Sequence, residues 1–310
     1  MKKSLATLIA IICLPVIAFN SYAAQEWTLT QDNVSLNLKG VSPYVERLSS
    51  GADRLYFASE AALPDPIMVM DCVEISCTRK SITSRFGSDA TIVTLNNGTR
   101  KVFFVEMGPS GKSIKFATLG ADGLSHGNAA SLDVDGSVVS QNEGAWGVPD
   151  AVVLPDGKVR VYWVFKDPAS GKPGLPEAVI SATSTDATAT TFKRDPGFRL
   201  TGGYVDTEVL RATDGDWVMI VSTGPGGGTQ KLFMATSSDG LAWKVNENSI
   251  SSPTESALDP TGYEIEKNTW RIYYASAAPG MVVDRTYMLK RATRSEEHTS
   301  ELQSLRHLVC

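Results

Sequence analysis

A β-hairpin unit that recurs five times constrains the fold of this chain more than any other feature. In its clearest copy, residues 148–165, Asp150 precedes a short apolar run, Pro155-Asp156-Gly157 forms a turn signal, and a second run is rich in aromatic residues. Apolar runs of this length on either side of a Gly turn predict two antiparallel strands. The other copies occupy residues 42–57, 89–104, 206–221 and 259–274.

The five units share one register. A large apolar residue follows the turn residue by five positions in every copy, and the first residue precedes the turn residue by nine positions in four copies and by seven in the copy that begins at Asp150. The units begin 47 to 61 residues apart, close to the ~40–50-residue period of a propeller blade with loop insertions. The large apolar residues are Tyr56, Phe103, Tyr162, Ile220 and Tyr273.

A second motif follows three of the hairpins and has its full form, ATSSDGLAW, at residues 235–243. The apolar residues before it predict a third strand, Asp239-Gly240 a turn, and Trp243 the start of a fourth strand. Four strands per repeat make a blade. The sequence therefore predicts an all-β fold, a five-bladed β-propeller over residues 24–293, with the last blade incomplete and almost no helix.

The N-terminal segment predicts export. Residues 1–23 combine Lys2 and Lys3, an apolar stretch from position 5 to 19, and small residues at a cleavage site, which is the pattern of a secretory signal peptide. The alternative, a membrane anchor, needs ~18–20 apolar residues and flanking stop-transfer charges, which this segment lacks. We expect a secreted or periplasmic protein without a membrane span.

The C-terminal segment, residues 294–310, departs from every repeat pattern and resembles translated sequencing adapter, which encodes residues 294–304 one for one. We expect a non-native tail, although a native charged tail is the alternative. Alignment of Ala292-Thr293 with Ala235-Thr236 predicts that the fifth blade is interrupted before its last turn and strand. Closure would then pair the last blade with the first, or borrow an N-terminal strand from residues 26–38.

Composition excludes several classes of function. Without the two ends, the 29 basic and 34 acidic residues fall to 25 and 31, a net charge of −6, which argues against nucleic acid and anionic membranes as partners. His126 is the one histidine left, so a zinc site of ordinary composition and histidine-based catalysis are not expected. We expect no metal, no cofactor and a monomer.

Two cysteines remain between the ends. Cys72 and Cys77 lie five positions apart in the expected first blade, after the unit at residues 42–57, with no histidine nearby. In an exported chain a disulfide persists, so we predict a local disulfide rather than a metal site.

Carboxylates remain for chemistry, and their place in the repeat suggests a site. We interpret Asp89, Asp150, Asp206 and Asp259 as the first residues of four units, with Ser42 in the fifth. The first strand of each propeller blade lines the central channel, so these side chains should converge on one mouth. Crowded carboxylates perturb one another's pKa values, as in binding or catalytic sites. The alternative is that each Asp caps the turn into its strand.

These features resemble the five-bladed propeller glycosidases of the arabinanase, xylosidase and invertase kind, and bacterial exported proteins described as sialidase-like. The shared elements are the first-strand acids, the Asp-Gly turns and the S-x-D-G-x-x-W motif at residues 237–243, and residues 180–210 are particularly similar to the sialidase-like group. The resemblance covers residues 42–293 and implies a propeller that acts on carbohydrate. The F-R-I-P motif of true sialidases is absent, so sialic acid is not the expected substrate.

The resemblance also implies three catalytic roles: a base, a group that modulates pKa, and a general acid. Asp89 and Asp150 match the first two roles, and Asp206 matches the third by register, with Glu208 two residues on. Because side chains two apart in a strand point the same way, Glu208 is the expected acid. Ser42 stands where those enzymes usually keep an Asp, which displaces the set by one blade.

Other residues are candidates for substrate binding. Asp259 should lie near the mouth, Trp146 offers an aromatic face for a sugar ring, and Arg85 or Arg199 could hold an acidic group; the alternative for Trp146 is packing between blades. Acids on different blades favour the wide carboxyl separation, ~6.5–9.5 Å, of inverting hydrolases. The expected function is an exported glycoside hydrolase, and the alternatives are a non-catalytic carbohydrate- or protein-binding propeller and a purely structural surface protein.

Overall fold

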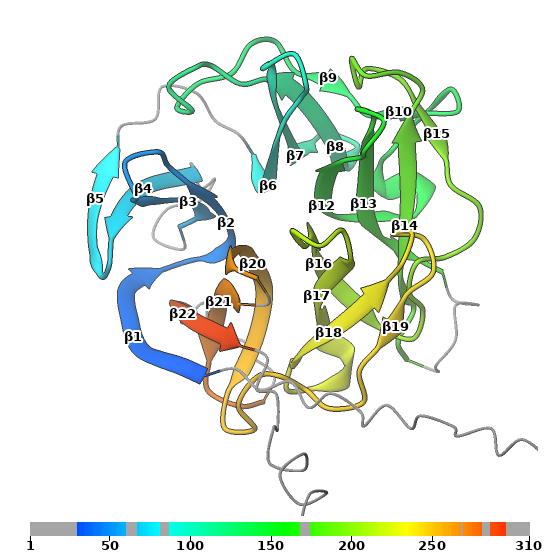
Figure 1. Cartoon of the computed structure of the whole chain (residues 1–310). Helices are drawn as coiled ribbons and strands as arrows, with labels where there is room; N and C mark the ends of the chain where they lie inside the picture. The colour runs from blue at the N-terminus through cyan, green and yellow to red at the C-terminus, as the bar shows by residue number, and fades with distance from the viewer. Residues whose placement is uncertain are drawn as a thin grey trace, which may run out of the picture.

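Five small β-sheets surround a central axis (Figure 1). The structure, a computed structural model, describes residues 30–59, 67–80, 87–167, 174–267, 269–280 and 286–295. Within these residues the only helices are two three-residue 3₁₀ turns, η1 (Gln141–Glu143) and η2 (Pro225–Gly227). The predicted all-β, five-bladed propeller is confirmed. No helix in the described ranges is long and apolar enough to cross a bilayer.

The five predicted hairpins form the two inner strands of each blade, and in blades one, two and four the strands run from the axis outward in the order of the sequence. Blade one contains β2 (Val41–Arg47), β3 (Asp53–Ala58), β4 (Ile67–Val73) and β5 (Ser76–Lys80). Blade two contains β6 (Ser88–Thr94), β7 (Arg100–Gly108), β8 (Gly111–Thr118) and β9 (Ala130–Ser131). Blade four contains β16 (Tyr204–Arg211), β17 (Trp217–Thr223), β18 (Leu232–Ser237) and β19 (Lys244–Val245).

Blade three is extended by a hairpin from the connection that precedes it. Its own strands are β12 (Ala145–Val153), β13 (Val159–Lys166), β14 (Glu177–Ser184) and β15 (Phe192–Arg194). The hairpin strands β10 (Asp133–Val134) and β11 (Ser137–Val138) add to its outer edge, where β10 pairs in parallel with β15. The extra hairpin makes this sheet six-stranded and leaves a cavity beside it.

Blade five joins the two ends of the described chain (Figure 1). It contains β20 (Ser256–Glu266), β21 (Thr269–Ala277) and β22 (Met288–Ser295), and β1 (Thr30–Lys39) pairs with β22 as the outermost strand. This is closure by an N-terminal strand, one of the two routes we expected. Because β1 pairs with the outer edge of β22, that edge is not left open for association. Residues 1–29 and 296–310 lie outside the described residues, whereas Arg294 and Ser295, the first two residues of the predicted tail, belong to β22.

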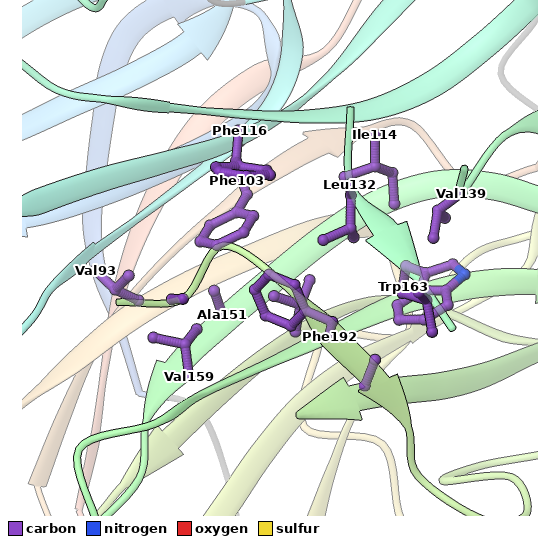
Figure 2. Close-up of a cluster of buried hydrophobic side chains, with 14 of the residues drawn as sticks. Val93, Phe103, Ile114, Phe116, Leu132, Val139, Ala151, Val159, Trp163 and Phe192 are labelled. Carbon is purple, nitrogen blue, oxygen red and sulfur yellow. The ribbon is translucent and has the colours of Figure 1, made fainter. Parts of the chain in front are cut away.

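Five clusters of buried apolar side chains hold the propeller together, one at each interface between neighbouring blades. Figure 2 shows the cluster between blades two and three, where Val93 lies near Val159 and Phe103 packs against Phe192. A fully buried large apolar side chain stabilises a fold by about 1.5–3 kcal/mol. The five large apolar residues in equivalent register are all at most 1% exposed: Tyr56, Phe103, Tyr162, Ile220 and Tyr273.

The Asp-Gly turns have a structural role. In blade four, the carbonyl oxygen of Gly240 accepts a hydrogen bond from Tyr162 Oη of blade three at 2.8 Å, and that of Asp239 accepts one from Arg160 Nη1 at 3.0 Å. Blade two repeats the arrangement, since the carbonyl oxygen of Gly123 accepts from Tyr56 Oη of blade one at 3.0 Å. The S-x-D-G-x-x-W motif therefore fastens one blade to the preceding one.

Candidate active site at the channel mouth

The innermost strand of every blade begins with a β-bulge. The pairing of β12 with β13, for example, shifts register between Gly147 and Asp150. A bulge kinks the strand and re-aims the side chains beside it. One residue in each bulge has a left-handed backbone, with φ between 49° and 53°: Ser42, Asp89, Val148, Asp206 and Asp259. We call these the bulge positions.

The bulges correct the sequence register in blade three. Val148, nine residues before Gly157, occupies the bulge position there, with φ 53°. Our interpretation of Asp150 as the counterpart of Asp89 was therefore wrong, because it followed residue type instead of the nine-residue spacing. Asp150 lies two residues later, at what we call the third position. The third positions of the five blades are Tyr44, Thr91, Asp150, Glu208 and Thr261.

One pocket at the channel mouth brings the predicted acids together. It is lined by bulge-position or third-position residues of all five blades. Its enclosed part measures about 30 Å³, and about 340 Å³ when the part open to solvent is included. The enclosed part is large enough for about two water molecules, so a larger ligand must lie over the outer part. The acids that line it are Asp89, Asp150, Asp206, Glu208 and Asp259.

Asp150 is a buried carboxyl group with several donors. Its Oδ1 accepts hydrogen bonds from Thr91 Oγ1 at 3.1 Å and from the backbone N–H of Ala151 at 2.8 Å. Its Oδ2 accepts from the N–H of Val209 at 2.5 Å. Burial raises the pKa of Asp150 to about 7 although these donors favour the ionised form. Both protonation states of Asp150 are therefore populated near neutral pH.

The surroundings of Glu208 favour its neutral form. Burial and the adjacent Asp150 raise its pKa well above the ordinary value. Its Oε1 accepts hydrogen bonds from the N–H of Gly262 at 3.0 Å and from Thr261 Oγ1 at 3.3 Å. With both donors on Oε1, the proton of the neutral form resides on Oε2. Glu208 can therefore donate a proton into the pocket that it lines.

Asp206 and Asp259 form a carboxyl pair between blades four and five. Burial raises the pKa of Asp206 to about 6, and burial together with Asp206 and Asp89 raises the pKa of Asp259 well above its usual range. Asp206 Oδ2 accepts from Ser222 Oγ at 2.6 Å, and Asp259 Oδ2 accepts from the N–H of Ser42 at 2.8 Å. The negative charge of Asp206 therefore disfavours ionisation of Asp259 across the interface.

Asp89 differs from the other four acids. Its side chain lines the pocket but the residue is only partly buried, whereas the other four are at most 9% exposed. Ser88 Oγ lies 3.3 Å from its Oδ2. Asp89 is thus the carboxyl group at this mouth with the best access to water.

The third-position side chains also bond one blade to the next. Asp150 and Glu208 accept from backbone N–H groups of the following blade, and so does Thr261, whose Oγ1 accepts from the N–H of Val45 at 3.1 Å. Tyr44 Oη donates to the carbonyl oxygen of Ile92 at 2.7 Å. The capping alternative from the sequence therefore describes part of what these residues do, although they cap the neighbouring blade.

Sequence reasoning missed Tyr44 as a pocket residue. It lines the mouth beside the acids, and burial together with Glu208 and Glu46 raises its pKa well above the ordinary value, so the phenol stays neutral. The signal was available in the repeat, because Tyr44 follows Ser42 by two residues as Glu208 follows Asp206. Blade one thus presents an aromatic ring where blades three and four present carboxyl groups.

The remaining predicted residues have different outcomes. Arg199 does not line the mouth, because its guanidinium folds back onto the carbonyl oxygens of Pro196 and Gly197. Arg85 and the side chain of Trp146 lie outside the described part of the structure. Cys72 and Cys77 form a disulfide across the β4–β5 hairpin, with an S–S distance of 2.09 Å. In the described ranges no group of three or more His, Cys, Asp or Glu side chains is arranged to hold a metal ion.

Neither a protein-family model nor a curated protein sequence matches this chain. Solved structures do match: a thermostable family-43 glycoside hydrolase has 12% identity and a TM-score of 0.61, over 85% of this chain and 92% of that one. An endo-arabinase from Bacteroides thetaiotaomicron VPI-5482 has 13% identity and a TM-score of 0.60, over 86% and 96%. An N-acetylgalactosamine deacetylase from F. plautii has 11% identity and a TM-score of 0.60, over 86% and 94%.

At these identities the similarity establishes the fold and leaves the chemistry to the site. The propeller that the resemblance to arabinanases and xylosidases implied is confirmed.

Proposed function

We propose that this chain is an exported glycoside hydrolase that acts on carbohydrate through the carboxyl groups of the channel mouth. One observation carries the proposal: five acids from four blades line a single pocket, and burial raises the pKa of four of them. Protonated and ionised carboxyl groups therefore coexist there near neutral pH. Cleavage of a glycosidic bond needs one carboxyl group of each kind.

Each acid has a role that its surroundings favour. Glu208, kept neutral by burial and by Asp150, is the general acid that protonates the leaving oxygen. The negative charge of Asp150 raises the pKa of Glu208 and so keeps the proton on Glu208. Asp150 therefore acts through Glu208, as a positioning residue. Asp89, the most accessible carboxyl group, is the base that activates water. The water that Asp89 activates attacks the anomeric carbon on the face opposite to the leaving oxygen, which Glu208 protonates. This geometry corresponds to inversion.

Two further observations support this proposal. The solved structures with this fold include a family-43 glycoside hydrolase and an endo-arabinase. Residues 1–23 have the composition of a secretory signal peptide, which is consistent with a substrate outside the cytoplasm.

A leaving-group series tests the role of Glu208. We expect the wild-type chain to hydrolyse one or more 4-nitrophenyl glycosides, and Glu208→Gln to lower kcat by about 10²–10⁴-fold on alkyl glycosides. On 2,4-dinitrophenyl glycosides, whose leaving group needs no proton, the same variant should retain most of its activity. Asp53→Asn, a buried acid at the junction of blades five and one, is the matched control. Equal losses on both substrate classes would exclude Glu208 as the acid.

A carbohydrate-binding propeller without turnover is the second candidate, and two observations favour it. The bulge positions of blades one and three carry Ser42 and Val148 in place of acids, and the enclosed pocket measures only about 30 Å³. Oligosaccharide titrations of the wild-type chain and of Asp89→Asn separate the two candidates. If both proteins bind the oligosaccharide and neither cleaves it, the binding module is supported. If the wild-type chain cleaves it and Asp89→Asn does not, the hydrolase is supported.

A further inference from the structure

A second cavity lies in blade three, and none of its lining residues lines the channel mouth. It is formed where the extra β10–β11 hairpin covers β13 and β14, it has a volume of about 270 Å³, and it is partly open to solvent. In Figure 2, Trp163 and Val139 lie together at the end of the apolar cluster opposite Val93. The apolar side chains that line the cavity include Val138, Val139, Ala145, Trp163, Phe165 and Ile180.

Arg194, an exposed residue of β15, places a cation at the rim of this apolar cavity. Its guanidinium lies over the ring of Phe165, 5.4 Å from the centroid, and over that of Trp163 at 6.0 Å. Stacking on aromatic faces leaves the in-plane N–H donors of a guanidinium available. Among the described residues no acceptor hydrogen-bonds to this guanidinium; Asp135 Oδ2 accepts from the backbone N–H of Arg194 instead, at 3.0 Å.

The surroundings restrict the ligand. Among the described residues that line the cavity, Asp135 and Ser137 are the only polar ones besides Arg194, too few to satisfy the hydroxyl groups of a sugar. The carboxylate of Asp135 repels a second negative charge, which disfavours a dianion such as phosphate. A dry cavity of about 150 Å³ accommodates one benzene ring, so about 270 Å³ has room for a ring and a short chain.

We propose that this cavity binds a small monocarboxylate with an aromatic or compact aliphatic body. The body packs against Trp163 and Phe165 beneath the hairpin, and the carboxylate accepts two hydrogen bonds from Arg194, the planar geometry that this side chain favours. The site is separate from the channel mouth and does not depend on the function proposed for it.

Fluorine NMR of the whole chain tests the proposal with two matched probes. We expect 3-(4-fluorophenyl)propanoate to bind, and the uncharged 3-(4-fluorophenyl)propanamide to bind several-fold more weakly, because an ion pair at an exposed arginine adds at most about 1 kcal/mol. Arg194→Met, which keeps an apolar cover over the rings, should reduce the affinity for the acid to that for the amide. Lys193→Met, on the exposed neighbour in β15, should leave both affinities unchanged.

A cavity-filling variant locates the site. Ala145 is 4% exposed and lines the cavity, so Ala145→Leu should weaken both probes while Arg194 remains. If that variant does not fold, Val138→Trp at the exposed rim serves the same purpose. The proposal is overturned if the acid does not bind at millimolar concentration, if wild type binds acid and amide equally, if Arg194→Met binds the acid as wild type does, or if phenyl phosphate binds more tightly than the acid.

Discussion

Val148 and Asp206 occupy the same bulge position in adjacent blades, with φ angles of 53° and 52°. In blade four the position is polar, since Asp206 accepts a hydrogen bond from Ser222 Oγ and pairs with Asp259. A β-branched residue such as Val148 is rare in the left-handed region because its side chain crowds the backbone. Blade three therefore carries local strain beside the pocket.

Relief of this strain is the first prediction. Asn adopts the left-handed region more readily than Val, so Val148→Asn should raise the free energy of unfolding by about 1 kcal/mol. For a chain of this size that corresponds to a rise of about 2–4 °C in Tm. Val73→Asn, at an exposed strand position with ordinary φ, is the control and should not stabilise. A loss of stability in Val148→Asn would mean that packing of the Val side chain outweighs the strain.

The same position explains why the site was only partly predictable. Spacing from the turn Gly was a reliable guide, and it places Val148 with Asp89 and Asp206. Residue type was misleading, because Asp150 belongs to the third positions with Glu208. A bulge cannot be recognised in a sequence without the pairing partner, so the sequence did not show that the bulge position and the third position both face the pocket. The two-residue spacing of Tyr44 from Ser42 was nevertheless visible in the repeat.

The pH dependence of stability follows from the buried acids. Burial raises the folded-state pKa of Asp150 from 3.8 to about 7 and that of Asp206 from 3.8 to about 6. Between these values the folded state keeps protons that the unfolded state has released, so stability is greatest at low pH in this window and falls as pH rises from about 4 to about 7. Urea unfolding at pH 5 and pH 8 should show the higher free energy of unfolding at pH 5.

Two variants examine the contribution of Asp150 to this pH dependence. Asp150→Asn should flatten it, because the amide does not titrate. Thr91→Val removes a donor that favours the ionised form, so the fall in stability should extend to higher pH. A wild-type chain that is more stable at pH 8 than at pH 5 would contradict the assignment.

The hydrolase proposal makes a separate kinetic prediction. Asp150 is one cause of the raised pKa of Glu208, so Asp150→Asn removes a negative charge and lowers that pKa. The basic limb of the pH–kcat/KM profile, where the general acid loses its proton, should move to lower pH in the variant. Asp53→Asn should leave the limb in place. A limb that stays fixed in Asp150→Asn would show that Glu208 does not set it.

The fold was more predictable than the site because the repeats carry it. Hairpin spacing and the Asp-Gly turns identified the blades, and the large apolar residues such as Tyr162 are the centres of the blade interfaces. The outer strand of blade five was predicted only as one of two alternatives, since β1 fills that position from the other end of the chain and carries no repeat motif. The blade-three cavity was also missed, because β10 and β11 contain two residues each and have no strand pattern.

The junction between blades five and one supplies the last prediction. Asp53 is 3% exposed and accepts hydrogen bonds from three residues, Tyr273 Oη at 2.5 Å, Tyr263 Oη at 2.7 Å and Arg47 Nη1 at 2.8 Å. Both tyrosines belong to β21 or β20 of blade five, so the carboxylate ties the last blade to the first. A hydrogen bond to a buried charge contributes about 1.5–3 kcal/mol.

Tyr273→Phe should therefore lower the free energy of unfolding by about 2 kcal/mol, because it leaves a buried carboxylate oxygen without its donor and keeps the ring in the core. Tyr263→Phe should cost less, since Tyr263 is only partly buried and water can replace its hydroxyl. Tyr204→Phe is the control, because that ring packs on Phe233 and its hydroxyl bonds to no described group. If urea unfolding gives Tyr273→Phe the same stability as Tyr204→Phe, Asp53 does not fasten the junction, and the apolar cluster between blades five and one holds it alone.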